Sequence, residues 1–309
     1  MNKPLISVII PNYCHSKYLA QRIESVLNQT YKNFEVIILD DCSPDDGASR
    51  SVIEKYRNNP YVSHIVYNEV NSGNTFMQWD KGIQMAKGEL CWIAESDDYC
   101  ELNMLEELVE AYMMQSNTVI AYSTVMFVND KGEYLSEKRS FPNQYFTSEE
   151  YIKRYLLFSN SIKNASCCIF SRQAALNVRE DYKNYPSAGD YFFWVYIAEQ
   201  GNIAVVNRQL SYFRRHDNVV TDKYAADGTN FVVEKNVVDY ICNSFHIDKF
   251  HKRLSEAYHH RGLRNFKYFD QGTRLKLFDL WNVKPKESFF MRVLLKLSDV
   301  LRYRLNYYI

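Results

Sequence analysis

Residues 90–98 read LCWIAESDD, an apolar run that leads directly into the acidic cluster formed by Glu95, Ser96, Asp97 and Asp98. Residues 90–94 have the length and composition of a buried strand. The three carboxylates of the acidic cluster repel one another unless a cation, solvent or the dipole of a following helix compensates them. The stretch therefore predicts a buried strand whose carboxyl end carries either a metal site or the start of a helix.

Strand-like and helix-like patterns alternate on both sides of this stretch. Apolar, β-branched runs at residues 5–10, 34–39 and 62–67 predict further strands, and helical periodicity fills residues 76–87 and 102–114. Repeated β-α units form mainly parallel sheets with helices on both faces. The predicted fold class is therefore α/β.

The pattern is less regular beyond these units. Residues 119–128 predict a longer strand, and residues 167–170 and 203–206 predict short ones. After about residue 222 the chain becomes helical, basic and rich in Tyr and Phe. We therefore expect a domain boundary between residues 222 and 223.

Polar side chains follow three of the predicted strands at the point where each strand ends. Pro11, Asn12 and Tyr13 follow the first strand, Asp40 and Asp41 follow the second, and the acidic cluster follows the fourth. Ligands of open parallel sheets bind beyond the carboxyl ends of the strands, so these groups should meet at one edge. Turn chemistry is the alternative for the two aspartates.

Five motifs in this order resemble the family 2 glycosyltransferases, an inverting group with the GT-A fold. The resemblance covers about residues 3–220, and it implies a GT-A catalytic domain over residues 1–222 followed by a basic helical region over residues 223–309. The motifs are SVIIPNY at 7–13, VIILDDCSPDDG at 36–47, NSGN at 71–74, KGELCWIAESDDY at 87–99 and AGDYFFW at 188–194.

The resemblance implies roles for individual residues. Asp97, Asp98 and His216 would bind Mn²⁺ or Mg²⁺, and Asp41 would meet the edge of a uracil or thymine base. The family pattern usually has Asp where Glu95 stands, and many relatives carry Arg and Asn where this chain has Trp79 and Asp80. The residues implied in nucleotide-sugar binding are Pro11, Asn12, Tyr13, Asp40, Asp41, Asn74, Glu95, Ser96, Arg214 and Arg215.

Three of these assignments have structural alternatives. Arg214 and Arg215 would lie near the diphosphate, or they would form a solvated basic turn with His216. Trp79 would stack on a sugar or belong to the core. The resemblance makes Asp190 the general base, which takes a proton from the acceptor hydroxyl opposite the leaving group. This chain has Gly189 where the family commonly has a second acid, and Asp190 could instead cap the helix that follows.

Charge and composition separate the two ends of the chain. The net charge is zero, but residues 1–100 carry −4 (nine Lys/Arg against thirteen Asp/Glu) and residues 249–309 carry +9 (fourteen against five). The seven cysteines show no C-x-x-C spacing, which favours reduced thiols. The run at 5–10 is too short for a signal peptide, and no apolar stretch of membrane-spanning length occurs. We therefore expect a cytoplasmic protein.

The last 26 residues carry an apolar stripe at helical spacing, flanked by Lys and Arg. This pattern favours either peripheral attachment to the anionic inner face of a membrane or packing on the catalytic domain or a second copy in a homodimer. The basic residues form no nucleic-acid-binding motif, so no nucleic acid is expected as a partner. The stripe consists of Phe290, Val293, Leu294, Leu297, Val300 and Leu301.

The main functional hypothesis is a metal-dependent inverting transferase, with a UDP- or dTDP-sugar as donor and a saccharide or lipid-linked acceptor. A nucleotidyltransferase would need a Gly-rich basic loop after the first strand, where the chain has Pro-Asn-Tyr-Cys. The remaining alternative is a degenerate transferase domain that binds saccharide or acts as a scaffold.

Overall fold

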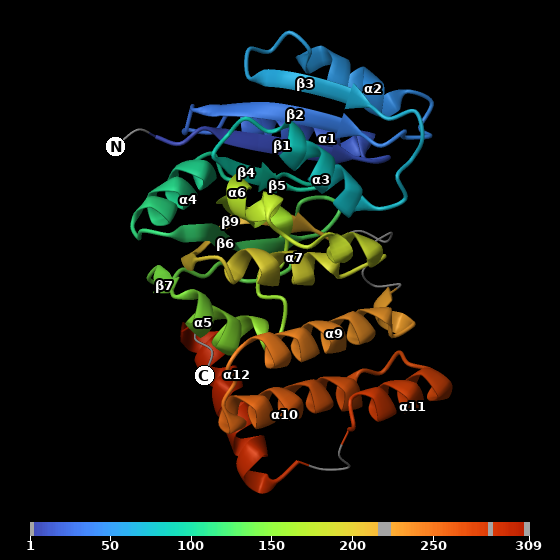
Figure 1. Cartoon of the computed structure of the whole chain (residues 1–309). Coiled ribbons are helices and arrows are strands. Elements are labelled where there is room, and N and C mark those ends of the chain that lie inside the picture. Colours follow the sequence, from blue (N-terminus) through green and yellow to red (C-terminus); the bar gives the residue numbers. More distant parts are fainter. Residues whose placement is uncertain (1–2, 216–223, 284–286, 306–309) are drawn as a thin grey trace.

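The computed structural model describes residues 3–215, 224–283 and 287–305 (Figure 1). Within these residues, nine strands form one sheet in the order β3-β2-β1-β4-β8-β6-β9-β5, and β7 pairs with β9. Helices cover both faces of the sheet, and a group of C-terminal helices lies beyond one of them (Figure 1).

The first half of the sheet is parallel, as the β-α repeats predict. The central strand β1 pairs with both β2 and β4, and β3 extends the sheet from β2. Asn12 lies opposite Asp40 and Ile9 lies opposite Ile93, so the carboxyl ends of three strands meet at one edge. These strands are β1 (Ile6–Asn12), β2 (Phe34–Asp40), β3 (Val62–Tyr67) and β4 (Leu90–Ile93).

The second half of the sheet is mixed. Strand β8 runs antiparallel to both β4 and β6, whereas β6 and β9 are parallel. The strand predicted at 203–206 is longer than expected and reaches Arg214, which carries that residue back to the acidic cluster. The strands of this half are β5 (Tyr99–Cys100), β6 (Thr118–Val128), β7 (Gln144–Phe146), β8 (Cys168–Ser171) and β9 (Asn202–Arg214).

Alternate residues of the central strands face two separate cores. Ile9 and Ile93 belong to one apolar cluster, whereas Val8 and Trp92 belong to the other. This alternation follows from the two-residue period of a strand, and burial on both faces explains why the strands read as continuous apolar runs. The first cluster packs under α3 (Thr75–Met85), α6 (Arg172–Leu176) and α7 (Gly189–Ala198), and the second under α1 (Ser16–Leu27), α2 (Ala48–Ile53) and α4 (Met104–Met113).

Helix α7 lies between the sheet and the C-terminal helices (Figure 1). Nine of its ten residues are buried, as expected for a helix that is apolar all round. Val233, Val237 and Ile241 of α9 belong to the same core cluster as α7. The helices outside the two faces are α5 (Ser148–Tyr151), α9 (Thr229–Ser244), α10 (Lys249–Asn265), α11 (Gln271–Leu280) and α12 (Phe289–Leu305).

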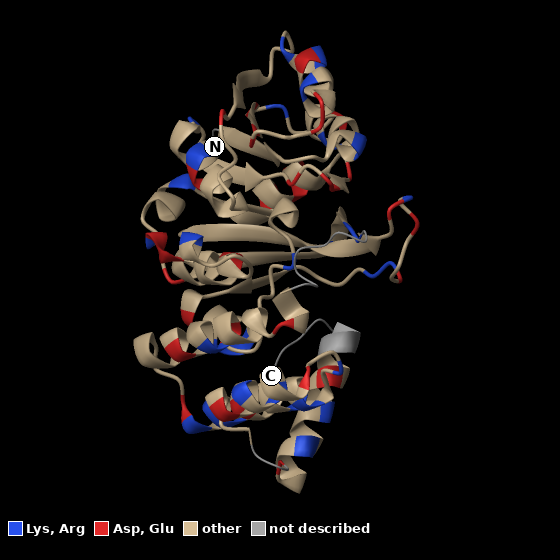
Figure 2. Ribbon diagram, turned by 90° about the vertical axis from the view of Figure 1, so that its right-hand side faces the viewer, with Lys and Arg blue, Asp and Glu red and all other residues tan. Residues whose placement is uncertain are grey.

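The C-terminal helices therefore share a continuous core with the sheet. Lys and Arg recur along their surfaces (Figure 2), as the +9 balance of residues 249–309 requires. The predicted boundary between residues 222 and 223 lies outside the described residues. No helix in the described ranges combines the length and apolarity that crossing a bilayer requires.

Candidate active site at the carboxyl edge of the sheet

The ends of β1 and β2 are joined by side-chain hydrogen bonds. Asn12 Nδ2 donates to Asp40 Oδ2 at 2.7 Å, and the backbone N–H of Ser43 donates to Asp40 Oδ1 at 3.0 Å. Asp40 is thus part of the turn after β2, as the turn alternative predicts. Pro11 is buried beside it, whereas Tyr13 is 46% exposed and presents its ring at the edge of the sheet.

Asp41 is buried and anchors the segment that follows β3. Its Oδ1 accepts from Asn68 Nδ2 at 2.6 Å and from Gln78 Nε2 at 2.9 Å. Its Oδ2 accepts from Ser72 Oγ at 2.7 Å and from Asn71 Nδ2 at 3.1 Å. The Asp41 carboxylate therefore fixes the loop after β3 and the start of α3. A nucleotide base that bound to Asp41 would meet a carboxylate that already accepts four hydrogen bonds from side chains.

Asn74 connects α3 to the segment before α7. Its side-chain oxygen accepts from Phe76 N at 2.8 Å, which caps the helix. Its amide nitrogen donates to the carbonyl oxygen of Lys183 at 2.7 Å.

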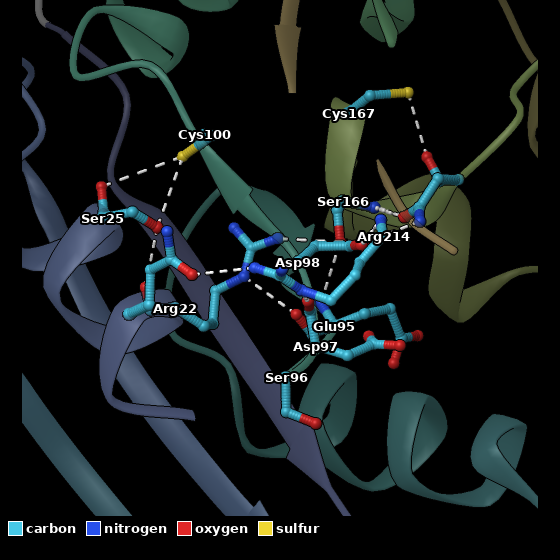
Figure 3. Close-up of polar contacts among 12 residues, drawn as sticks. Arg22, Ser25, Glu95, Ser96, Asp97, Asp98, Cys100, Ser166, Cys167 and Arg214 are labelled. Atoms are coloured by element: carbon cyan, nitrogen blue, oxygen red, sulfur yellow. Dashed lines mark hydrogen bonds and ion pairs between the residues drawn. The ribbon is translucent and has the colours of Figure 1, made fainter. Parts of the chain in front are cut away.

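Asp98 is the buried anchor of the acidic cluster (Figure 3). It is 1% exposed, and it accepts from the backbone N–H of Arg214 at 3.0 Å and from Asn164 Nδ2 at 2.7 Å. Arg22 Nη2 lies 3.9 Å from Asp98 Oδ2 in a fully buried ion pair. Burial and the repulsion of Asp97 raise the pKa of Asp98 to about 7.

Arg22 is a site residue that sequence reasoning missed. Its Nε donates to the carbonyl oxygen of Glu95 at 2.8 Å, and its guanidinium lies over the Trp92 ring, 5.7 Å from the ring centroid. The sequence does contain an indication of this role, because Arg22 falls three residues after Leu19, on the apolar face of an amphipathic helix. A charge in that position indicates a buried partner.

Arg214 also supports the acidic cluster and links it to α1 (Figure 3). Its Nε donates to the carbonyl oxygen of Asp97 at 2.8 Å, and its Nη2 donates to Gln21 Oε1 at 2.8 Å. The side chain is buried and stacks on Tyr18, 4.7 Å from the ring centroid. The solvated-turn alternative is therefore wrong for Arg214. Its neighbour Arg215 is half-buried, and His216 lies outside the described residues.

Glu95 is held by a tryptophan. Trp79 Nε1 donates to Glu95 Oε1 at 2.8 Å, and the backbone N–H of Glu95 donates to Ser166 Oγ at 3.0 Å. Trp79 is 3% exposed and packs on Phe193, so the core alternative is confirmed. Two of the departures from the family pattern, Trp79 and Glu95, thus form one contact, because the longer side chain of glutamate reaches the indole nitrogen.

The charge of the acidic cluster is poorly compensated inside the protein. Burial and the repulsion of Asp97 raise the pKa of Glu95 to about 8. Asp97 itself is half-buried, and Ser96 is buried with its Oγ 2.9 Å from His15 Nδ1. His15 is a second neighbour that the sequence did not suggest.

The cluster fits a hard divalent cation that keeps open positions. Its donors are carboxylate oxygens, which Mg²⁺ and Mn²⁺ prefer, and a cation would relieve their repulsion. Across residues 3–215, 224–283 and 287–305, no three His, Cys, Asp or Glu side chains gather as a complete ligand set. Such an ion is often held by one or two carboxylates and substrate phosphates.

Asp190 lies in the first turn of α7, and the structure rejects the capping alternative. The N-cap position belongs to Ala188, with a left-handed φ of 56°. Asp190 Oδ2 accepts from Asn160 Nδ2 at 2.8 Å, and burial raises the pKa of Asp190 to about 6. The carboxyl group lines a cavity of about 620 Å³, together with Arg215.

Steric crowding explains why position 189 is a glycine. A Cβ atom at this position would lie 2.3 Å from the carbonyl oxygen of Tyr182 and 2.7 Å from Phe76 Cε2. The second acid of the family pattern therefore has no room in this chain, and Asp190 stands alone.

Comparison with known proteins agrees with this architecture. The model of glycosyl transferase family 2 matches residues 7–178, more than half of the chain. The Bacillus subtilis (strain 168) protein named "Putative teichuronic acid biosynthesis glycosyltransferase TuaG" is 27% identical over 233 residues, which cover 74% of this chain and 87% of TuaG. Chondroitin synthase of Escherichia coli is 26% identical over 209 residues, which cover 66% of this chain but 28% of the synthase.

Two solved structures share the fold. The S. aureus protein TarS (residues 1–349, in complex with UDP-GlcNAc) superposes with a TM-score of 0.64 at 21% identity, over 96% of this chain and 80% of that one. The mannosyltransferase PcManGT of Pyrobaculum calidifontis, in complex with GDP-Man and Mn²⁺, superposes with a TM-score of 0.57 at 12% identity. The superposition covers 98% of this chain and 81% of PcManGT.

An α/β sheet with an acidic cluster at its carboxyl edge, together with these likenesses, defines a glycosyltransferase with the GT-A fold. The chain belongs to glycosyl transferase family 2.

The Trp79–Glu95 hydrogen bond gives a stability test with a matched control. Trp79→Phe removes the donor of a buried carboxyl group, which should lower the free energy of unfolding by about 1–3 kcal/mol beyond the packing loss. Trp194 lies in the same aromatic cluster, and its Nε1 has no hydrogen-bond partner in the described part of the chain. Trp194→Phe should therefore show the packing loss alone in urea unfolding. Equal losses for the two variants would contradict a stabilising role for the hydrogen bond.

Proposed function

We propose that this enzyme transfers a sugar, with inversion, from a UDP- or dTDP-activated donor to a saccharide or lipid-linked acceptor. The observation that carries the proposal is Asp190, a desolvated carboxyl group facing a cavity in a family 2 chain. TarS was solved with UDP-GlcNAc, which supports a uridine donor. The names of TuaG and chondroitin synthase support a role in polysaccharide synthesis.

The nucleotide-sugar would lie along the carboxyl edge of the sheet. Asn12, Tyr13 and Asp41 lie at the ends of β1 and β2, where the nucleoside would bind, and the acidic cluster lies where the diphosphate would reach. Asp97 would hold Mn²⁺ or Mg²⁺, as the Mn²⁺ complex of PcManGT supports. Asp98, which the sequence predicted as a second metal ligand, instead keeps the cluster in place, because both of its oxygens are engaged by Arg22, Asn164 and the backbone of Arg214. Glu95 and Ser96 would line the donor side.

A bound divalent ion would supply Lewis-acid stabilisation of the departing nucleoside diphosphate. His216, which follows β9, would complete its ligand set. The chain's own contribution is to hold Glu95 and Asp98 by hydrogen bonds from Trp79, Asn164 and the backbone of Arg214, which exist before the ligand arrives. Such preorganisation avoids reorganisation cost in the transition state.

Asp190 would act as the general base from the acceptor side. Its carboxylate would accept the proton of the attacking hydroxyl as the new C–O bond forms and the bond to the diphosphate breaks. Asn160 donates to Asp190 Oδ2 at 2.8 Å, and this hydrogen bond fixes the carboxyl group at the lining of the cavity where the acceptor would bind. Because burial raises the pKa to about 6, the base is ionised at neutral pH but is more basic than an exposed aspartate.

Substitution of Asp190 tests this proposal. Asp190→Asn should slow release of UDP or dTDP from nucleotide-sugars, with water or sugar as acceptor, by about 10²–10⁴-fold while the affinity for UDP stays unchanged. The wild-type rate should rise with pH and level off above about pH 6, since only the ionised carboxyl accepts a proton. Asp181→Asn, in the segment before α7, is the control. Full turnover by Asp190→Asn would rule out this base.

Helix α12 supports attachment to a membrane surface. Phe289, Phe290, Val293, Leu297 and Val300 are each at least 47% exposed, whereas Leu295 faces inward and is buried in the core. The helix therefore packs by one face and presents an apolar stripe with the other, and Leu294 of the predicted stripe belongs to the packed face. Asp299 is neutralised by Arg261 at 2.7 Å, so exposed Arg292 and Lys296 leave this surface basic. We propose an anionic lipid surface as its partner, which suits a lipid-linked acceptor.

Vesicle pelleting tests the stripe. The full chain should pellet with phosphatidylglycerol-containing vesicles and less with vesicles of phosphatidylcholine alone. The double variant Phe290→Ser/Leu297→Ser should lose most of this binding, because it removes apolar side chains that the membrane would bury. Leu275→Ser/Leu280→Ser, at exposed positions of α11, is the control. Unchanged pelleting of the α12 variant would contradict the proposal. A dimer that this variant dissociates would assign the stripe to a second copy.

A further inference from the structure

The cavity at Asp190 is lined by the second half of the sheet domain and by the C-terminal helical region. Asp190 enters it from α7, and Glu234 enters it from α9, within the C-terminal helical region. Its volume of about 620 Å³ lies within the usual range for small-molecule sites, about 300–1,000 Å³. The C-terminal region therefore contributes directly to the surroundings of the proposed base.

Glu234 has no structural partner that explains its position. It forms no hydrogen bond and no ion pair within the described residues, although it is half-buried. Its neighbours on α9, Val233 and Val237, pack in the core and fix the rotation of the helix. Burial raises the pKa of Glu234 to about 7, against the opposing charge of Lys163. The carboxyl group of Glu234 therefore lines the cavity without a hydrogen-bond donor from the described residues, and a ligand hydroxyl group could supply that donor.

The opposite wall carries further unpaired acceptors. Ser159 and Asn160 line the cavity, and in the described part of the chain Ser159 Oγ and Asn160 Oδ1 are buried without a hydrogen-bond partner. The amide nitrogen of Asn160 is already used on Asp190. Hydroxyl groups of a ligand could satisfy these oxygens, because each hydroxyl both donates and accepts.

The remaining lining suits a sugar more than an anion. Phe127 and Phe213, with ring centroids 5.5 Å apart, supply apolar surface for the C–H face of a sugar ring. Two carboxyl groups, Asp190 and Glu234, balance the two cations, Lys163 and Arg215, so the lining has no excess positive charge. A phosphate or carboxylate would meet the two acids as well as the two cations, whereas the hydroxyl groups of a neutral polyol can hydrogen-bond to all four side chains.

We propose that this cavity binds a neutral sugar unit of the acceptor and that Glu234 is a positioning residue which holds an acceptor hydroxyl group. The inference rests on the proposed function, because it places the acceptor on the side of Asp190. It adds that the C-terminal helix α9, outside the region matched by the family model, selects the acceptor.

Saturation-transfer NMR with methyl glycosides of glucose, galactose, mannose and N-acetylglucosamine tests the inference on the full chain, with UDP in the same sample. At least one glycoside should bind the wild type, and Glu234→Ala should weaken it by about tenfold or more, the loss expected for a hydrogen bond to a charged group. Glu234→Gln, which keeps the side-chain volume, should lie between the two. Asp239→Asn is the control, since Asp239 lies on the same helix and pairs with Lys235 outside the cavity.

The UDP signals separate this inference from the proposed function. They should be unchanged in every variant, because the nucleotide would lie at the sheet edge. Failure of the wild type to bind either UDP or, in a parallel sample, dTDP would contradict the proposed function and leave the glycoside result to be judged separately. Failure of all four glycosides to bind the wild type would overturn the inference, and so would equal glycoside affinity of Glu234→Ala and the wild type.

Discussion

The buried ion pair between Arg22 and Asp98 is the interaction on which the site depends. Both side chains are fully buried, and the terminal nitrogens of Arg22 have no hydrogen-bond acceptor in the described residues, so its charge is balanced through space at 3.9 Å. Asp98 takes its hydrogen bonds from Asn164 and Arg214 instead. Removing one member of such a pair typically costs about 3–5 kcal/mol, since the other charge stays buried. Helix α1, β9 and the acidic cluster are thereby tied to one point.

Around this anchor, three departures from the family pattern, at Trp79, Glu95 and Gly189, have a physical explanation. Glu95 is longer than the usual aspartate and reaches Trp79, which stands where relatives carry a cation. Gly189 is small because Phe76 and Tyr182 fill the space. The pair of Glu95 and Trp79 keeps an acid on the donor side, and Gly189 leaves Asp190 in place at the start of α7. Because the proposed metal-binding and base carboxyl groups are all present, the site agrees with an active transferase.

The sequence predicted the parallel half of the fold because burial on both faces leaves continuous apolar runs. It also predicted that Asn12, Asp40 and the acidic cluster meet at one edge, which the β1 register and the Asn12–Asp40 bond confirm. The mixed half could not be predicted, since β8 and β5 are short and their pairing depends on distant segments. Arg22, Asn164 and Glu234 were missed for a related reason: each acquires its role only through a partner far away in the chain.

The central claim is that the acidic cluster is a metal site that serves a nucleotide. Calorimetric titration of UDP into the full chain with and without Mn²⁺, for the wild type and Asp97→Asn, tests it most directly. We predict that Mn²⁺ strengthens UDP binding to the wild type and that this gain disappears in Asp97→Asn. UDP affinity that is the same with and without Mn²⁺, or a Mn²⁺ gain that survives in Asp97→Asn, would contradict it.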